Sequence, residues 1–295
     1  MSIHFTDTQR HGLGMLLVVG ASLVLAAMNA GVKWLALRDY PALQISLFNG
    51  SFGLLSVFVW LLAKRNLGSL LRLDPLLAVY VPVFVAATFC LFYGFGHGHL
   101  GQISVIVAAS PLVVAVLSFF FLGEKLSRWQ GFLAVAGFIG IVVAIRPGGS
   151  APPSLPEFVA LAGTFGLAAS QVLVRSLSRK MHTLAIIFYF YAAMVVTAAC
   201  VVPLKAIAPS DLPVFIFCGL CDILALFLMY TAFRFAPPSI VTPFQYTNVL
   251  WSVLLGYLLW SETPTVWTVI GAAIIIAAGI LFTHNVLQRK EPAPA

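Results

Sequence analysis

Apolar residues along this chain gather into ten long runs separated by short polar segments. The runs cover residues 13–36, 42–63, 75–96, 101–122, 129–146, 156–176, 183–204, 212–233, 239–260 and 265–285. About 20 mostly apolar residues are needed for a helix to span a bilayer, whereas barrel strands alternate over about ten residues. Because these runs are apolar all round, the pattern predicts an all-α integral membrane protein with ten transmembrane helices.

The composition agrees with a lipid environment. Hydrophobic residues make up 61% of the chain and charged residues only 8%, against about 25% charged residues in soluble domains. The net charge of +7 does not indicate nucleic-acid binding, because the cations are spread over gaps between apolar runs and form no basic stripe. Cys218 and Cys221 have metal-like spacing, but no second pair or histidine cluster accompanies them. We therefore expect no metal and no cofactor.

Lysines and arginines predict the orientation, because cytoplasmic loops are rich in them. With the N-terminus inside, the outer side holds only Lys33, Arg38, Arg146 and Lys205, and the other twelve cations lie inside. Both termini are therefore predicted to be cytoplasmic.

The sequence contains an internal repeat. Glu124 is followed five residues later by Trp129, and Glu262 is followed in the same way by Trp267, so one offset of 138 residues relates both pairs. Five apolar runs separate the copies, and because five is odd the second copy enters the membrane from the opposite side. We expect a first five-helix repeat over 1–146, a linker over 147–155, an inverted second repeat over 156–285 and a cytoplasmic tail over 286–295.

Inverted repeats are typical of secondary transporters, whose substrate site lies near the bilayer midplane between the halves. The chain resembles the EamA-like branch of the drug/metabolite transporter superfamily. The resemblance rests on Gly123-Glu124 after the fourth run, on Ser261-Glu262 after the ninth, where serine replaces the usual glycine, and on Pro111 and Pro243, which are not at equivalent positions. It implies two five-helix repeats, a bacterial inner membrane, and export of amino acids or other metabolites, or import of cofactors or S-adenosylmethionine.

Polar side chains inside the runs are candidates for the substrate site. Asp222 is the only carboxylate far from a predicted helix end, which favours a ligand for a substrate amine or a proton carrier. A structural bond to a neighbouring helix is the alternative. Gln245, Asn248 and Trp251 form a polar and aromatic cluster in the ninth run, which suits either a ligand or polar contacts between helices. Asn29 and Gln171 recur at matching places in the first and sixth runs.

The predicted substrate-binding set comprises Asn29, Tyr93, Gln102, Ser110, Gln171, Asp222, Tyr230, Gln245, Asn248 and Trp251. We expect it to line a central cavity between the first, third, fourth, sixth, eighth and ninth runs.

The sequence lacks the phosphate-binding GxxxxGK[ST], the zinc motif HExxH and the nucleophile elbow GxSxG. No enzyme activity is therefore expected. The predicted function is export of amino acids, including aromatic or hydrophobic ones, by a gradient-driven carrier. An importer of a cofactor-like metabolite such as S-adenosylmethionine or a vitamin is the alternative, and an intramembrane enzyme or a channel fits less well. The expected partners are a small-molecule substrate and the lipid bilayer, with no nucleic acid, and a monomer is expected.

Overall fold

The structure, a computed structural model, describes residues 7–63, 65, 67–71, 73–122, 127–145, 154–201, 204–235 and 242–288. Within these residues every regular element is a helix. The α-helices are α1 (Asp7–Ala36), α2 (Ala42–Ala63), α3 (Leu77–His97), α4 (Leu100–Ala108), α5 (Ser110–Leu122), α6 (Arg128–Ile145), α7 (Leu155–Leu177), α8 (Thr183–Val201), α9 (Leu212–Phe235), α11 (Thr247–Trp260) and α12 (Val266–Gln288). Two 3-10 helices are η1 (Leu67–Leu71) and η2 (Thr242–Tyr246). Glu124, the segment 146–153 and the tail after residue 288 lie outside the description, as do the side chains of Arg175 and Tyr230.

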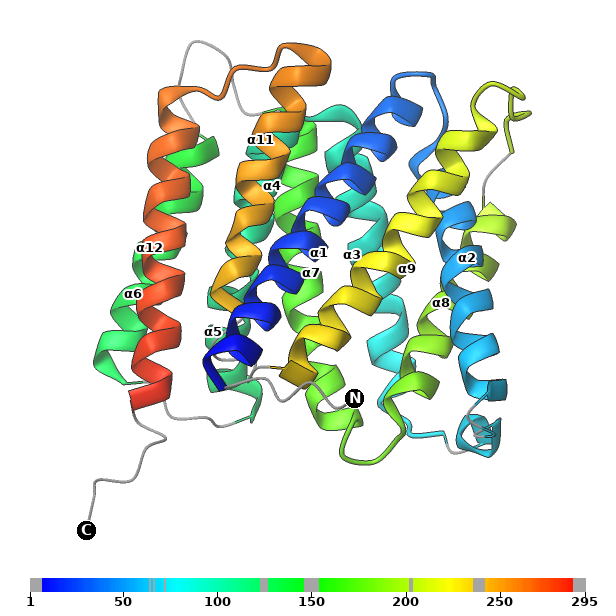
Figure 1. The fold of residues 1–295 in the computed structure, drawn as a ribbon, viewed down its shortest axis with the longest axis horizontal. Helices are drawn as coiled ribbons and strands as arrows, with labels where there is room; N and C mark the ends of the chain where they lie inside the picture. The colour runs from blue at the N-terminus through cyan, green and yellow to red at the C-terminus, as the bar shows by residue number, and fades with distance from the viewer. Residues whose placement is uncertain are drawn as a thin grey trace.

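The long helices run side by side between two ends of one bundle (Figure 1). Helix α1 begins and helix α12 ends at the same end of the bundle, called here the terminal end, and the opposite end is the distal end. Among the described residues, eight helical segments are long and apolar enough to cross a membrane, and Val266–Phe282 is a shorter apolar segment. The chain is thus an α-helical integral membrane protein.

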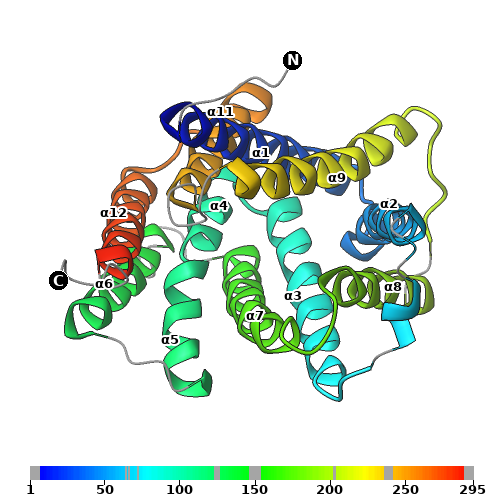
Figure 2. The same cartoon turned by 60° about the horizontal axis from the view of Figure 1, so that its bottom comes forward.

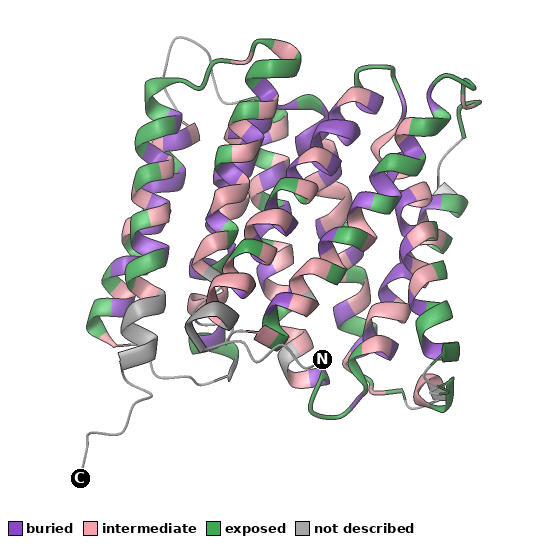
Figure 3. Cartoon of the chain, in the orientation of Figure 1, coloured by how far each residue is buried: buried purple, intermediate pink, exposed green. Residues whose placement is uncertain are grey.

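Exposed positions recur along the outer helices (Figure 3), and many of them carry large apolar side chains. Phe120 and Phe121 of α5 are 72% and 76% exposed, and Val266 of α12 is 71% exposed. Contiguous apolar surface of this kind is unfavourable in water and favourable in lipid.

Two of the predicted helices are interrupted by prolines. The run 101–122 is divided at Ala109 into α4 and α5, and Pro111 follows the break. Proline has no N–H to donate, and its ring clashes with the carbonyl four residues earlier, which ends a regular helix. The described part of the run 239–260 begins as the 3-10 helix η2, which contains Pro243, and becomes α-helical only at Thr247.

The most extensive helix contacts pair α1 with α9, α3 with α7, α6 with α12, and α2 with α8 (Figure 2). Each pair joins a helix from residues 1–146 to one from residues 154–288. Glycines allow the closest approaches: a methyl group added at Gly271 of α12 would lie 2.6 Å from the carbonyl oxygen of Gly140 in α6. The two halves of the chain are therefore interleaved rather than packed as separate lobes.

Candidate functional site

A central cavity of about 420 Å³ lies in the middle of the bundle. Its polar lining residues are Ser22 of α1, Ser104 of α4, Ser110 of α5, Gln171 of α7, Gln245 and Tyr246 of η2, and Asn248 of α11. Apolar lining residues include Leu25, Val107, Pro111, Val114, Leu167 and Met229. Both halves of the chain contribute to it, and the interrupted segments α4–α5 and η2–α11 both border it. The volume suits a small metabolite.

The polar groups of the central cavity are only partly engaged by the protein. Asn248 Nδ2 donates to the Ser22 carbonyl at 3.0 Å. Gln171 Nε2 reaches Ser110 Oγ only at 3.4 Å, close to the limit for a hydrogen bond. Ser104 Oγ is buried, and no described atom forms a hydrogen bond with it. Buried polar groups normally have partners, so the Ser104 hydroxyl is available to the polar part of a solute, and the exposed Gln171 amide can turn toward the same solute.

No formal charge is found on any described residue that lines the central cavity. A solute with a net charge would have to leave water without an opposite charge to replace it, which is costly. The described lining therefore suits a solute with no net charge, a polar group and an apolar body.

Tightly packed apolar side chains close the central cavity toward the distal end. This distal plug consists of Met28, Val32, Leu35, Leu100, Ile103, Ile106 and Phe215, each at most 5% exposed. In α1 and α9 the plug residues lie further toward the distal end than the cavity residues. In α4, Leu100 and Ile103 precede the cavity residue Ser104, and Ile106 lies between Ser104 and Val107. In the described part of the chain, this plug therefore separates the central cavity from the distal end.

An ion pair fastens the helices beside the plug. Lys33 of α1 pairs with Glu262, which follows α11, and their side chains are only 7% and 13% exposed. Lys33 Nζ also donates to the Gly98 carbonyl at 2.8 Å, and Glu262 Oε2 accepts the Leu100 N–H at 2.9 Å. The contact joins α1, the α3–α4 turn and α11 at the distal end.

Ser261 explains how Glu262 reaches this position. Its φ of 55° is in the left-handed region that ends α11, where glycine is usually favoured. The turn directs Glu262 back over the bundle. The backbone N–H of Glu262 donates to the Gly256 carbonyl at 3.1 Å.

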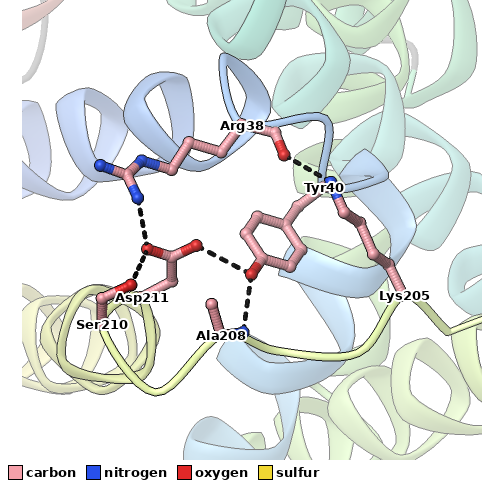
Figure 4. Close-up of polar contacts among 6 residues, drawn as sticks. All are labelled: Arg38, Tyr40, Lys205, Ala208, Ser210 and Asp211. Carbon is pink, nitrogen blue, oxygen red and sulfur yellow. Dashed lines mark hydrogen bonds and ion pairs between the residues drawn. The ribbon is translucent and has the colours of Figure 1, made fainter.

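A second polar cluster at the distal end joins the α1–α2 and α8–α9 connections (Figure 4). Asp211 accepts hydrogen bonds from Arg38 Nη1 at 2.7 Å, Tyr40 Oη at 2.8 Å and Ser210 Oγ at 3.1 Å. Lys205 Nζ donates to the Arg38 carbonyl at 2.8 Å. Burial raises the pKa of the Asp211 carboxyl, but the bonds from Tyr40, Ser210 and Arg38 outweigh it and hold that pKa below its usual value.

Four of the predicted site residues meet at the central cavity: Ser110, Gln171, Gln245 and Asn248. The third apolar run, which forms α3, was expected to border the central cavity, but none of its described residues lines it. Ser22 was missed because it contributes a backbone carbonyl, which no side-chain pattern marks. Ser104 is recognisable from the sequence as one of the polar residues of the fourth run, beside Gln102 and Ser110, but it stands outside the predicted set, and its place at the cavity depends on the break before Pro111.

The structure places the other predicted residues elsewhere. Asn29 is buried within α1. Tyr93 borders a separate cavity of about 820 Å³ and stacks on His97 with ring centroids 4.4 Å apart. Gln102 donates to the Ala144 carbonyl at 3.3 Å and lies beside Glu262 in a pocket of about 110 Å³.

Two further predicted residues lie apart from the described lining of the cavity. Asp222 Oδ2 accepts a hydrogen bond from Tyr191 Oη at 2.7 Å. Trp251 is half-buried, and its Nε1 has no hydrogen-bond partner among the described atoms. The side chain of Tyr230 falls outside the described residues. The roles predicted for these residues stay predictions.

Comparison with known proteins identifies the family. The EamA-like transporter family matches residues 12–146 and again 154–284. The pseudopaline exporter CntI of Pseudomonas aeruginosa is 29% identical over 277 residues, which cover 92% of this chain and 96% of that protein. The S-adenosylmethionine uptake transporter of Rickettsia bellii is 26% identical over 199 residues, covering 65% of this chain and 67% of that protein.

Two further proteins with lower sequence identity match nearly the whole chain. The riboflavin transporter of Rhizobium johnstonii is 24% identical over 307 residues, 97% of this chain and 96% of that protein. A solved crystal structure with 16% sequence identity covers 97% of this chain and 100% of its own with a TM-score of 0.63, a likeness of fold. These relatives are named as transporters and not as enzymes. The chain is a membrane transporter of small molecules and belongs to the EamA-like transporter family.

Proposed function

We propose that this chain is a secondary carrier of ten transmembrane helices in two inverted five-helix repeats, over 1–146 and 156–285, which works by alternating access. The shared offset between Glu124–Trp129 and Glu262–Trp267 supports this repeat. The two successive matches to one family model support it as well. Inverted repeats provide two similar gates around one site, which alternating access requires.

The central cavity is the observation that carries this proposal. It is lined from both halves, lies in the middle of the bundle, and is closed toward the distal end by the distal plug and by the Lys33–Glu262 pair. A channel would need a continuous path, whereas a closed end above a central site is typical of one state of a carrier. The other state would require α1 and α11 to separate at the distal end.

The substrate we propose is an amino acid with an aromatic or hydrophobic side chain, moved outward across a bacterial inner membrane. The uncharged described lining favours solutes without net charge, and Leu25, Val114 and Met229 offer apolar contacts. With both termini cytoplasmic, as the lysine and arginine distribution predicts, the terminal end faces the cytoplasm and the distal end is the closed outer side. The similarity to an exporter along nearly the full length also supports outward transport.

Import of a cofactor-like metabolite is the second candidate, because similar proteins are named for uptake of S-adenosylmethionine and for riboflavin transport. The described lining of the central cavity distinguishes a cationic cofactor from a neutral one. A cationic cofactor would need a carboxylate, which no described lining residue supplies. A neutral ring system with hydroxyl groups could use Ser104, Gln171 and Asn248.

Purified protein in liposomes can test the function with four labelled probes: phenylalanine, leucine, riboflavin and S-adenosylmethionine. We expect exchange of the neutral amino acids well above protein-free liposomes. Asn248→Ala and Gln171→Ala should each weaken apparent affinity by about three- to tenfold, the size of one hydrogen bond. Leu254→Ala, on an exposed apolar position of α11, is the matched control. Flux of S-adenosylmethionine alone would contradict the proposed substrate, and absence of flux for all four probes would contradict the carrier.

A further inference from the structure

Asp222 lies near the middle of α9, within the membrane-spanning part of the chain. Its Oδ2 accepts a hydrogen bond of 2.7 Å from the hydroxyl of Tyr191 in α8. Gly53 of α2 makes room for that tyrosine, because a methyl group at Gly53 would collide with the Tyr191 ring. Packing of three helices therefore sets the position of the hydroxyl that faces the carboxyl.

Among the described helices that pack against α9, no cation lies where it could pair with Asp222. α1 and α2 pack against α9, and α8 reaches it through Tyr191. α2 and α8 contain no Asp, Glu, Lys, Arg or His at all, and α1 has none between residues 12 and 32. Within α9, Arg234 is twelve residues away, about 18 Å along the helix. The titratable groups near Asp222 in the described part of the chain are Tyr191 and, on its own helix, the adjacent Cys221 and Cys218 one turn away.

The charge of such a carboxylate is poorly compensated. One hydroxyl donor does not neutralise a full negative charge, and a charge in the membrane interior without a partner is unfavourable. A protonated carboxyl carries no charge and still accepts the Tyr191 bond at its carbonyl oxygen. Gaining and losing a proton is therefore the change that this site can undergo without a second ion.

Residues next to Asp222 line cavities on two sides of α9. Ala225 and Met229, three and seven residues further along, line the central cavity and share its side of the helix. Tyr191 and Ile223 line a second, largely apolar cavity of about 350 Å³ between α2, α8 and α9. Asp222 itself is half-buried and lines neither cavity, but its neighbours in α9 and its partner Tyr191 do. A change in its charge thus acts on the helix that forms one wall of the solute site.

We propose that Asp222, positioned by Tyr191, is the proton-binding site through which solute movement is coupled to the proton gradient, an inference that rests on the carrier function proposed above. The proton adds to a carboxylate oxygen from water on one side and returns to water on the other. No other reactant is needed, and for an exporter the proton moves inward as solute moves outward.

Infrared spectroscopy of the protein in lipid bilayers tests the proton site without any solute. The C=O stretching band of a protonated carboxyl should vanish from the spectrum of Asp222→Asn, and in the wild type it should disappear as the pH is raised. Asp39→Asn is the matched control, because Asp39 is exposed in the α1–α2 connection. Tyr191→Phe should shift the frequency of the band, since the carboxyl loses its donor. A spectrum of Asp222→Asn that equals the wild type at every pH overturns the proposal.

Transport tests the coupling, with labelled phenylalanine as the probe. For a one-to-one exchange, a gradient of one pH unit supports about tenfold accumulation. The readout is a ratio within each variant, accumulation with the gradient divided by accumulation without it. This ratio should fall to about one in Asp222→Asn and recover in Asp222→Glu. An unchanged ratio in Asp222→Asn overturns the coupling role. If the wild type moves no phenylalanine, the carrier proposal fails, and the infrared band decides separately whether Asp222 binds a proton.

Discussion

Lys33 and Glu262 form an ion pair between the distal ends of α1 and α11. Lys33 comes from the first half of the chain and Glu262 from the second, and both also bind the α3–α4 turn through Gly98 and Leu100. The pair lies beside the distal plug, since Lys33 stands between Val32 and Leu35 in α1. It therefore holds the halves together where a carrier must open. Separating two mostly buried charges is costly, which stabilises the distally closed state.

Removing one charge should favour distal opening. In Glu262→Gln, Lys33 keeps its charge without a counter-charge, and we expect the closed state to lose at least about 1.4 kcal/mol, a tenfold shift in the equilibrium. The measurement is labelling of Ser104→Cys, in a background without the native cysteines, by an impermeant maleimide added on the distal side. Lys33→Met combined with Glu262→Gln should restore part of the protection. Equal labelling rates with and without Glu262→Gln would show that the pair does not hold the gate.

The Asp211 cluster predicts a pH dependence of stability. The pKa of Asp211 lies below its usual value of about 3.9. Ionised Asp211 therefore stabilises the fold above that value, and the stabilisation is lost as the pH falls through the lower pKa of the folded state. The melting temperature of Asp211→Asn should lie below that of the wild type at neutral pH, and the gap should narrow below about pH 4. The control variant Asp39→Asn should melt at the same temperature as the wild type. A difference in melting temperature between Asp211→Asn and the wild type that stays constant with pH would contradict this account.

Replacing Ser104 by alanine should affect stability and solute affinity in opposite directions. Its hydroxyl is buried without a partner among the described atoms, so Ser104→Ala should leave stability unchanged or raise it by up to about 1 kcal/mol. If the hydroxyl binds solute, the same variant should weaken solute affinity by about three- to tenfold. Ser46→Ala is the control, because Ser46 Oγ donates to the Ala42 carbonyl at 2.8 Å far from the cavity lining. Thermal unfolding and exchange kinetics measure the two effects, and a Ser104→Ala variant that loses stability but keeps its affinity would rule out this role.

Gly53 tests the packing that positions Tyr191. A methyl group there would collide with the tyrosine ring, so Gly53→Ala should cost about 1–3 kcal/mol of stability. Gly131 of α6 is the matched control, because a methyl group there meets no atom within 4 Å. Alanine is also the better helix former, so Gly131→Ala should be neutral or stabilising. Chemical denaturation in detergent compares the two, and equal effects would contradict the packing argument.

The sequence predicts the helices well, because length and apolar character alone decide whether a segment can span a bilayer. It does not predict how Pro111 acts, since a proline can bend a helix or divide it, and here α4 ends at Ala108. Gln245 and Asn248 were recognisable because they are polar within an apolar run. The Asp222–Tyr191 bond and the Arg38–Asp211 pair could not be predicted, because their partners lie 31 and 173 residues apart and meet only through helix packing.

The most direct test of alternating access is a reversible cross-link at the distal end. Lys33→Cys and Glu262→Cys, in a background without other cysteines, would be joined by a bifunctional methanethiosulfonate that dithiothreitol cleaves. We predict that cross-linked protein in liposomes stops exchanging phenylalanine, that the reductant restores exchange, and that each single-cysteine variant is unaffected by the reagent. Undiminished exchange through the cross-linked protein would contradict the claim that the distal end must open.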